Sequence, residues 1–138
     1  MNFRYLYYFS KDLIYMKSII INTILLITSL SSVDDLIILF ETKNNINISG
    51  YLNTESQIII DEKIHKGNSY QQSLVLDDFF DVSKVDRFKV IHRGGSENNL
   101  IYILGEYSSN TDIYKVLITL TKSEKELTIK KIKIDKKL

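Results

Sequence analysis

The second half of the chain alternates apolar and polar residues with a period of two, and this rhythm constrains the fold more than any other feature. From Asp86 onward the alternation recurs in four runs, separated by short polar stretches at Gly94-Gly95, 108–110 and 122–124. A period of two places every second side chain on the same face of an extended strand. Four such runs joined by short turns predict an antiparallel meander.

The individual runs differ in ways that predict their places in the sheet. In the first run Phe88, Val90 and His92 share one face, and the residues between them share the other. The run Leu100–Leu104 is apolar on both faces, which is typical of a central strand. In the last run the alternation changes phase across Lys130-Lys131, which is the pattern that a β-bulge produces.

A helix is predicted over residues 69–81. Ser69 and Gln72 have the spacing of a capping box, and the apolar residues that follow recur at four-residue intervals, which places them on one helix face. Phe79 and Phe80 lie at the end of this helix. We expect both rings to pack the helix onto the sheet.

The region between residues 32 and 68 carries weaker patterns. Ser32 with Asp35 predicts the start of a short helix, and residues 57–61 are a β-branched run typical of a strand. Residues 46–53 are ambiguous between an amphipathic turn and an irregular segment, and residues 62–68 are predicted to be a polar turn. Helices early and antiparallel strands late predict an α+β domain, with N-terminal helices packed on a curved antiparallel sheet.

The first 31 residues are of a different kind. Three basic residues precede an apolar run from Ile19 to Leu30, and small residues follow it. This arrangement predicts a secretory signal peptide over residues 1–31, with Met16 as an alternative start, and a single exported domain over residues 32–138, periplasmic or extracellular. An uncleaved anchor and a buried first helix are the alternatives. The run is shorter than the about 20 residues of a comfortable span, so we expect no stable membrane span after cleavage.

Composition excludes several classes of function. The chain has no cysteine, which excludes disulfides, cysteine-based zinc sites and thiol nucleophiles. Its 18 Lys and Arg residues nearly balance its 17 Asp and Glu residues, so no charge excess favours binding to nucleic acid. The two histidines, His65 and His92, are too far apart to indicate a metal site, and we expect no cofactor.

Several short segments of the C-terminal half together match the pattern of a known family. They are Asp78-Phe79-Phe80 at the helix end, Phe88–His92 followed by a basic residue and Gly94, Gly105, Tyr114–Val116 and the terminal strand Leu127–Ile134. The stretch Asp77–Asp135 that contains them resembles DUF4783, an exported and mainly Bacteroidetes family of unknown function in the nuclear-transport-factor-2-like (cystatin-like) superfamily. The resemblance extends back to about Asp34.

This resemblance implies a cone in which a curved sheet, wrapped by helices, surrounds a pocket. Members of the superfamily include isomerases and dehydratases as well as ligand-binding and dimerising modules. The family has no activity that can be carried over to a residue of this chain, so the fold leaves the function open.

His92 is the one residue inside the predicted domain that could titrate near neutral pH. It is predicted to share a strand face with Phe88 and Val90. If their shared face is concave, His92 is a candidate general base. The candidate acids are Asp61, Asp78 and Glu106, although no spacing brings one of them to His92. The residues predicted to line a ligand pocket are Phe88, Val90, His92, Tyr102 and Tyr114. The structural alternative is a half-exposed histidine at a strand end, with the aromatic residues in the core and His65 at the surface.

The sequence therefore predicts a non-enzymatic exported module that binds a small molecule or a protein. Because both faces of the Leu100–Leu104 run are apolar, a second copy of the chain is one candidate cover for the open sheet face. The alternative hypothesis is an isomerase- or dehydratase-like enzyme that uses His92.

Overall fold

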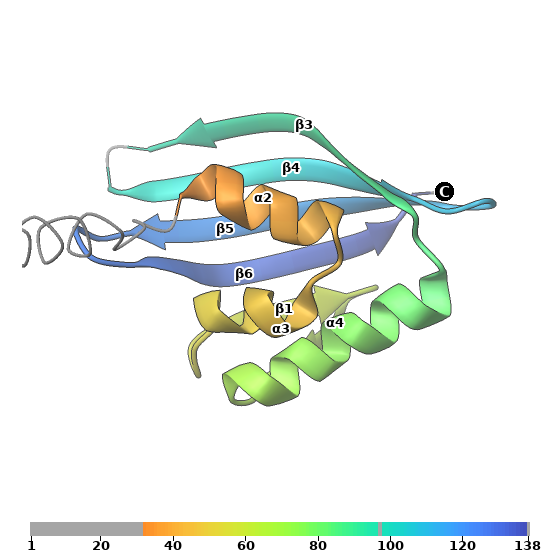
Figure 1. Ribbon diagram of the computed structural model, residues 1–138, viewed down its shortest axis with the longest axis horizontal. Helices are drawn as coiled ribbons and strands as arrows, with labels where there is room; N and C mark the ends of the chain where they lie inside the picture. The colour runs from red at the N-terminus through yellow and green to blue at the C-terminus, as the bar shows by residue number, and fades with distance from the viewer. Residues whose placement is uncertain (1–31, 97, 138) are drawn as a thin grey trace, which may run out of the picture. The chain divides into compact units, whose positions relative to one another are not determined.

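The computed structural model describes residues 32–96 and 98–137, and there three helices pack on one face of a curved six-stranded sheet (Figure 1). The helices are α2 (Val33–Glu41), α3 (Asn45–Ile48), continued by the 3₁₀ turn Ser49–Tyr51, and α4 (Ser69–Ser83). The strands are β1 (Gln57–Ile60), β2 (Lys63–His65), β3 (Arg87–Gly95), β4 (Leu100–Ser108), β5 (Ile113–Lys122) and β6 (Leu127–Lys136). The predicted α+β class is confirmed. The predicted signal peptide over residues 1–31 lies outside the described residues.

The sheet has the strand order β2-β1-β6-β5-β4-β3. Strands β3 to β6 form the predicted antiparallel meander. Strand β1, however, lies parallel to β6, so the sheet is mixed where an antiparallel sheet was predicted. Hydrophobic alternation reports which face a residue occupies and carries no information on the direction of a distant neighbour.

Two bulges interrupt the meander. On β6, Thr119 pairs with Lys131 and Leu120 with Ile129, so Lys130 is the extra residue, as the phase shift of the sequence predicts. On β3, Val90 pairs with Gly105 and His92 with Leu104, so Ile91 is a second extra residue that was not predicted.

The bulge at Ile91 corrects the predicted faces of β3. Phe88 pairs with the buried Tyr107 on the helix-covered face. On β4 the side chains of Ile103 and Tyr107 face the helices, so Leu104 between them faces the other way. His92 pairs with Leu104 and therefore lies on that opposite face. The prediction that His92 shares a face with Phe88 and Val90 is therefore wrong.

The prediction that Gly94-Gly95 forms the turn is also wrong. Both glycines belong to the end of β3, where Gly94 pairs with Tyr102 and Gly95 with Ile101. A Cβ at position 94 would lie 2.5 Å from the Tyr102 hydroxyl, so glycine lets that aromatic side chain lie close to the backbone. The chain reverses over the next residues, and Asn99 there adopts a positive φ of 56°.

The capping of α4 begins one residue earlier than predicted. The Asn68 Oδ1 accepts a hydrogen bond from the Gln71 N–H at 2.9 Å, and the Gln71 Oε1 accepts one from the Asn68 N–H at 3.1 Å. Gln72, predicted to cap the helix, is instead buried and donates through Nε2 to the carbonyls of Asn53 and Gly67. The predicted capping box of Ser32 and Asp35 at the start of α2 is confirmed.

The predicted polar turn over residues 62–68 contains strand β2. Ile60 pairs with Lys63, so Asp61 and Glu62 alone connect β1 to β2, and both have positive φ, of 44° and 70°. Two positive φ values are what a type I′ hairpin turn requires. The turn brings β2 back against β1, at the edge of the sheet beside α4.

Replacing Glu62 by glycine is expected to stabilise the protein by about 0.5–1 kcal/mol, because an L-residue is strained at positive φ and glycine is not. Chemical denaturation measures the change. The same exchange at Glu41, in the last turn of α2, is the control, because there glycine is expected to lower the stability. Equal effects at the two positions would contradict the strained turn.

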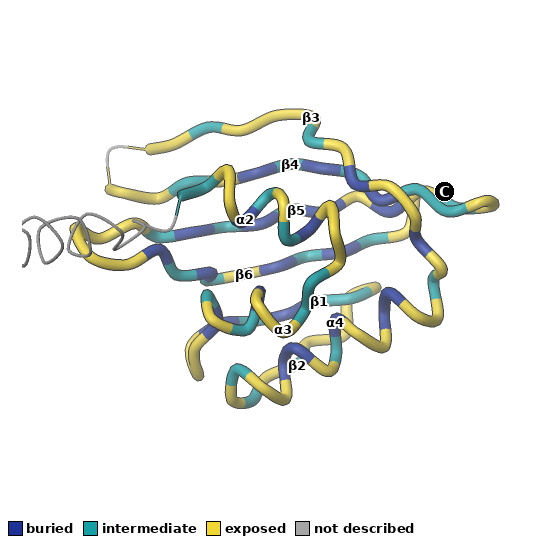
Figure 2. The backbone as a smooth tube through the Cα atoms, in the orientation of Figure 1, coloured by how far each residue is buried: buried dark blue, intermediate teal, exposed yellow. Residues whose placement is uncertain are grey.

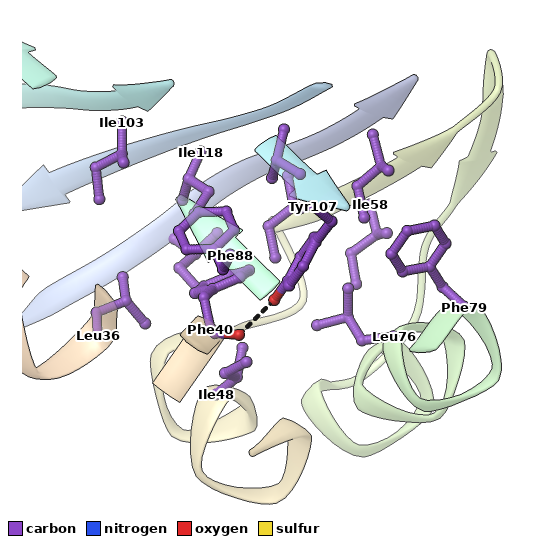
Figure 3. Packing of buried hydrophobic residues seen from close by; sticks show 14 of the residues in the cluster. Leu36, Phe40, Ile48, Ile58, Leu76, Phe79, Phe88, Ile103, Tyr107 and Ile118 are labelled. Carbon is purple, nitrogen blue, oxygen red and sulfur yellow. Dashed lines mark hydrogen bonds between the residues drawn. The ribbon is translucent and has the colours of Figure 1, made fainter. Parts of the chain in front are cut away.

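A hydrophobic core of aliphatic and aromatic side chains fills the space between the sheet and the helices (Figure 3). Its aromatic cluster consists of Phe40, Phe79, Phe80, Phe88, Tyr107 and Tyr114. The Phe88 ring lies 4.8 Å from the Tyr107 ring and 5.7 Å from the Phe40 ring, measured between centroids. The Tyr107 hydroxyl donates a hydrogen bond of 2.6 Å to the Phe40 carbonyl, and burial raises the pKa of Tyr107. Figure 2 shows the buried residues concentrated on β4, β5, β6 and α4. The predicted packing of Phe79 and Phe80 onto the sheet is confirmed, since both rings contact Tyr107.

Candidate functional site

The five predicted pocket residues do not lie together. Phe88 is buried in the aromatic cluster, and Val90 packs half-buried against it. Tyr114 is buried on the same face of the sheet, where its ring meets the Phe79 ring edge-on at 5.2 Å. His92 and Tyr102 lie on the opposite face.

His92 has Tyr102 as its neighbour. Its Nε2 lies 3.3 Å from the Tyr102 hydroxyl, and both side chains are exposed. No carboxylate of the described residues forms an ion pair with His92, and Glu106, a predicted acid on this face, pairs with the Lys137 amine at 3.3 Å. Among the described residues, no acid therefore forms an ion pair with His92.

The two other predicted acids, Asp61 and Asp78, line a groove of about 440 Å³ together with His65. The β1–β2 hairpin forms one wall and α4 forms the other. Ile60 of β1, Phe79 of α4 and Tyr114 of β5 also line it. The remaining lining residues are Lys63, Val75, Val82, Ser83 and Lys136.

Strand pairing explains why these residues meet. His65 pairs with Ile58 and Lys63 with Ile60, and Ile58 is fully buried on the helix-covered face, so Lys63 and His65 point toward α4. Lys136 follows the part of β6 that pairs with β1. The groove was not predicted, because it depends on the parallel pairing of strands that are about 70 residues apart in sequence.

Some of the charges at the groove are paired. The Lys136 amine lies 2.9 Å from the Asp112 carboxylate, which lowers the pKa of Asp112 and raises the pKa of Lys136 through a hydrogen bond between them. The Asp61 carboxylate accepts a hydrogen bond from the Lys136 backbone N–H at 3.1 Å. Lys63, His65 and Asp78 form no ion pair or hydrogen bond with another described side chain.

The sheet face opposite the helices, here called the open face, carries two ordered rows. The apolar row consists of Leu104, Leu117, Ile59 and Ile64, which follow one another across the sheet with Lys133 inserted between Leu117 and Ile59. The charge ladder consists of Lys89, Glu106, Lys115 and Asp135, each directly opposite the next on neighbouring strands β3 to β6. Opposite charges at such positions attract one another.

Within residues 32–96 and 98–137, no three His, Asp or Glu side chains gather into a set that could hold a metal ion. In the same part of the chain no helix combines the length and the apolar character needed to cross a bilayer.

The sequence matches the family described as "Domain of unknown function (DUF4783)" over residues 33–135. No curated protein matches the chain.

Solved structures share the fold. A DUF4783 family protein from Bacteroides uniformis is 22% identical, with a TM-score of 0.70 over 78% of this chain and 99% of that one. A second, from Bacteroides ovatus, is 20% identical, with a TM-score of 0.67 over 75% and 93%. Nuclear transport factor 2 from Cryptosporidium parvum is 16% identical, with a TM-score of 0.53 over 76% and 88%. These likenesses show the nuclear-transport-factor-2-like fold, and they assign no function.

Proposed function

The chain belongs to the DUF4783 family, and from the geometry of its open face we propose that it is a non-enzymatic protein-binding module that pairs with a second copy of itself. The observation that carries this proposal is the charge ladder beside the apolar row. The leucines are half-buried, so a partner could cover them, and the charges beside them could fix the register of that partner.

The sign pattern of the ladder favours a second copy as the partner. The charges run positive, negative, positive, negative from Lys89 on β3 to Asp135 on β6. Suppose that the open faces of two copies stack on each other about a two-fold axis that runs parallel to the strands, between β4 and β5. The strand order of one copy is then reversed over the other, and so is the order of the charges. This arrangement places Lys89 over Asp135 of the other copy and Glu106 over Lys115, so opposite charges meet at the four ladder positions. Within their own chain, Glu106 also pairs with Lys137 and Asp135 with Lys133.

The two leucines of the apolar row fit the same symmetry, whereas Ile59 and Ile64 fall beyond β3 of the other copy. Leu104 pairs with Leu117 across β4 and β5, on the two sides of this axis. Rotation about the axis places Leu104 of one copy against Leu117 of the other. The contact removes half-exposed leucine surface from water, which favours association.

The alternative hypothesis, an isomerase- or dehydratase-like enzyme that uses His92, has less support. Such chemistry calls for a histidine and an acid that converge in a cavity. Buried aliphatic and aromatic side chains occupy the space between sheet and helices, and His92 lies on the open face beside Tyr102.

We also propose that the protein is exported, on the pattern of basic and apolar residues before Ser32. Mass spectrometry of the protein recovered from its native cell is expected to show a mature N-terminus near Ser32. A chain that retains Met1 or Met16 would contradict cleavage.

The dimer is tested by sedimentation equilibrium of the purified protein. Leu117→Lys is expected to weaken association by about tenfold or more, because it places an ammonium against the apolar row of the other copy. Ile38→Lys is the matched control, since Ile38 is 53% exposed on α2, away from the open face. A wild-type protein that remains monomeric at every concentration would overturn the proposal.

A charge exchange tests the symmetry separately. Lys115→Glu is expected to weaken the dimer, because it then faces Glu106 of the other copy. The double variant Glu106→Lys, Lys115→Glu restores an opposite pair at these two positions, both within the sheet and between the copies. It also sets like charges side by side at positions 89 and 106 and at positions 115 and 135, so association is expected to recover only in part. Recovery of folding without recovery of association would show that the ladder acts only within one chain.

A further inference from the structure

The groove between the β1–β2 hairpin and α4 has unpaired side chains of opposite charge on its two walls, and the proposed dimer does not use it. One wall carries Lys63 and His65 on β2, and the other carries Asp78 on α4. Lys63 and Asp78 line the same groove, yet neither forms an ion pair with the other or with any other described residue. Each remains available to a charged group of a ligand.

The floor of the groove is apolar. The Phe79 ring, 5% exposed, and the Tyr114 ring, 8% exposed, meet edge-on with Ile60 beside them in the lining. Val82, at the rim, is 74% exposed. A ligand with an apolar body would remove this valine from water and rest on aromatic side chains that the core already holds in place.

The other charged residues of the lining are already engaged. The Lys136 amine is paired with Asp112, and the Asp61 carboxylate accepts the Lys136 backbone N–H. Asp61 keeps its negative charge at the end of the hairpin wall. The charged side chains without a partner are therefore Lys63 on one wall and Asp78 on the other, so neither a simple anion nor a simple cation satisfies both. The unmatched charges call for a ligand that carries both signs around an apolar body.

We propose that this groove binds a short apolar peptide with free termini. Its carboxylate pairs with Lys63 and His65, its ammonium pairs with Asp78, and an apolar side chain lies on Phe79 and Tyr114. The groove volume of about 440 Å³ lies within the range of small-molecule sites and accommodates a dipeptide.

Isothermal titration calorimetry with leucyl-leucine as the probe tests this proposal. The free dipeptide is expected to bind at least about tenfold more tightly than its N-acetylated, C-amidated form, which has the same apolar body and no charges. Lys63→Gln and Asp78→Asn are each expected to weaken binding of the free dipeptide by a similar factor. Lys66→Gln and Asp77→Asn, at neighbouring exposed positions outside the groove lining, are the matched controls and are expected to bind as the wild type does.

A double reversal sharpens the test. The double variant Lys63→Asp, Asp78→Lys exchanges the charges at these two positions. A zwitterionic dipeptide can bind in the opposite orientation, so binding is expected to recover relative to either single reversal. Equal binding of the free and the capped dipeptide would overturn the proposal, as would binding of hexanoate with no binding of the dipeptide. Amide shifts in nuclear magnetic resonance confined to residues outside the groove would also overturn it. The Leu117→Lys variant is expected to retain peptide binding, so failure of the dimer leaves this test intact.

Discussion

Replacing Phe79 by alanine is expected to lower the free energy of unfolding by about 3–5 kcal/mol, because a buried aromatic side chain is lost and the helix cannot collapse into the space. The Phe79 ring is 5% exposed and contacts the rings of Phe80, Tyr107 and Tyr114. It joins α4 to the sheet on the side of Tyr107 that faces away from Phe88 (Figure 3). Urea denaturation followed by circular dichroism measures the loss.

The control for this prediction is Val82→Ala on the same helix. Val82 is 74% exposed, so its truncation is expected to change the stability by no more than about 0.5 kcal/mol. Phe79→Leu keeps most of the apolar volume and is expected to lose less than the alanine variant, which keeps the comparison measurable if Phe79→Ala does not fold. A loss below about 1 kcal/mol for Phe79→Ala would mean that α4 does not lie on the sheet as described.

Gly105→Ala is expected to destabilise the protein by about 3 kcal/mol, the upper end of the usual cost of overpacking. A Cβ at this position would lie 2.5 Å from the Phe88 Cζ and 3.1 Å from the Lys89 carbonyl oxygen. Phe88 cannot move aside, because Phe40 and Tyr107 pack against it. The thermal midpoint and the denaturant midpoint are both expected to fall.

Gly94→Ala is the matched control for this clash. Its Cβ would also meet an aromatic side chain at 2.5 Å, the Tyr102 hydroxyl, but Tyr102 is 38% exposed and can turn into solvent. We expect a cost below about 1 kcal/mol there. In the double variant Gly105→Ala, Phe88→Leu, the smaller side chain makes room, so the two changes are expected to cost less together than the sum of their separate costs. Additive costs would show that Phe88 is not the obstacle.

Elements with a strong local pattern were predicted correctly. Strands β3 to β6 follow from alternation, and the bulge at Lys130 follows from a break in the buried series between Ile129 and Ile132. The bulge at Ile91 does not break the hydrophobic alternation of the sequence, because β3 is an edge strand whose residues after Val90 are mostly exposed. Exposed residues carry little information on register, so the face of His92 was predicted wrongly.

The candidate site was less predictable than the fold. The candidate acids Asp61 and Asp78 and the predicted surface residue His65 were named from the sequence. No sequence pattern indicated that they share a groove with Lys63 and Lys136. They meet because β1 pairs in parallel with β6 and a two-residue turn at Asp61-Glu62 folds β2 back toward α4. Both arrangements depend on the packing of distant segments.

The sequence by itself determined the α+β class, the four-stranded meander, the packing helix and the family, because each of these rests on local periodicity or on a linear pattern of residues. Only the tertiary structure decided which face carries His92 and that a hydrophobic core, with Phe40, Phe88 and Tyr107 in it, fills the space under the sheet. It also decided that a groove lined by charges of both signs lies beside α4. The physical reason is that strand register and partner choice are set by contacts between residues far apart in the chain. A one-residue bulge at Ile91 is enough to move a side chain from one face of the sheet to the other.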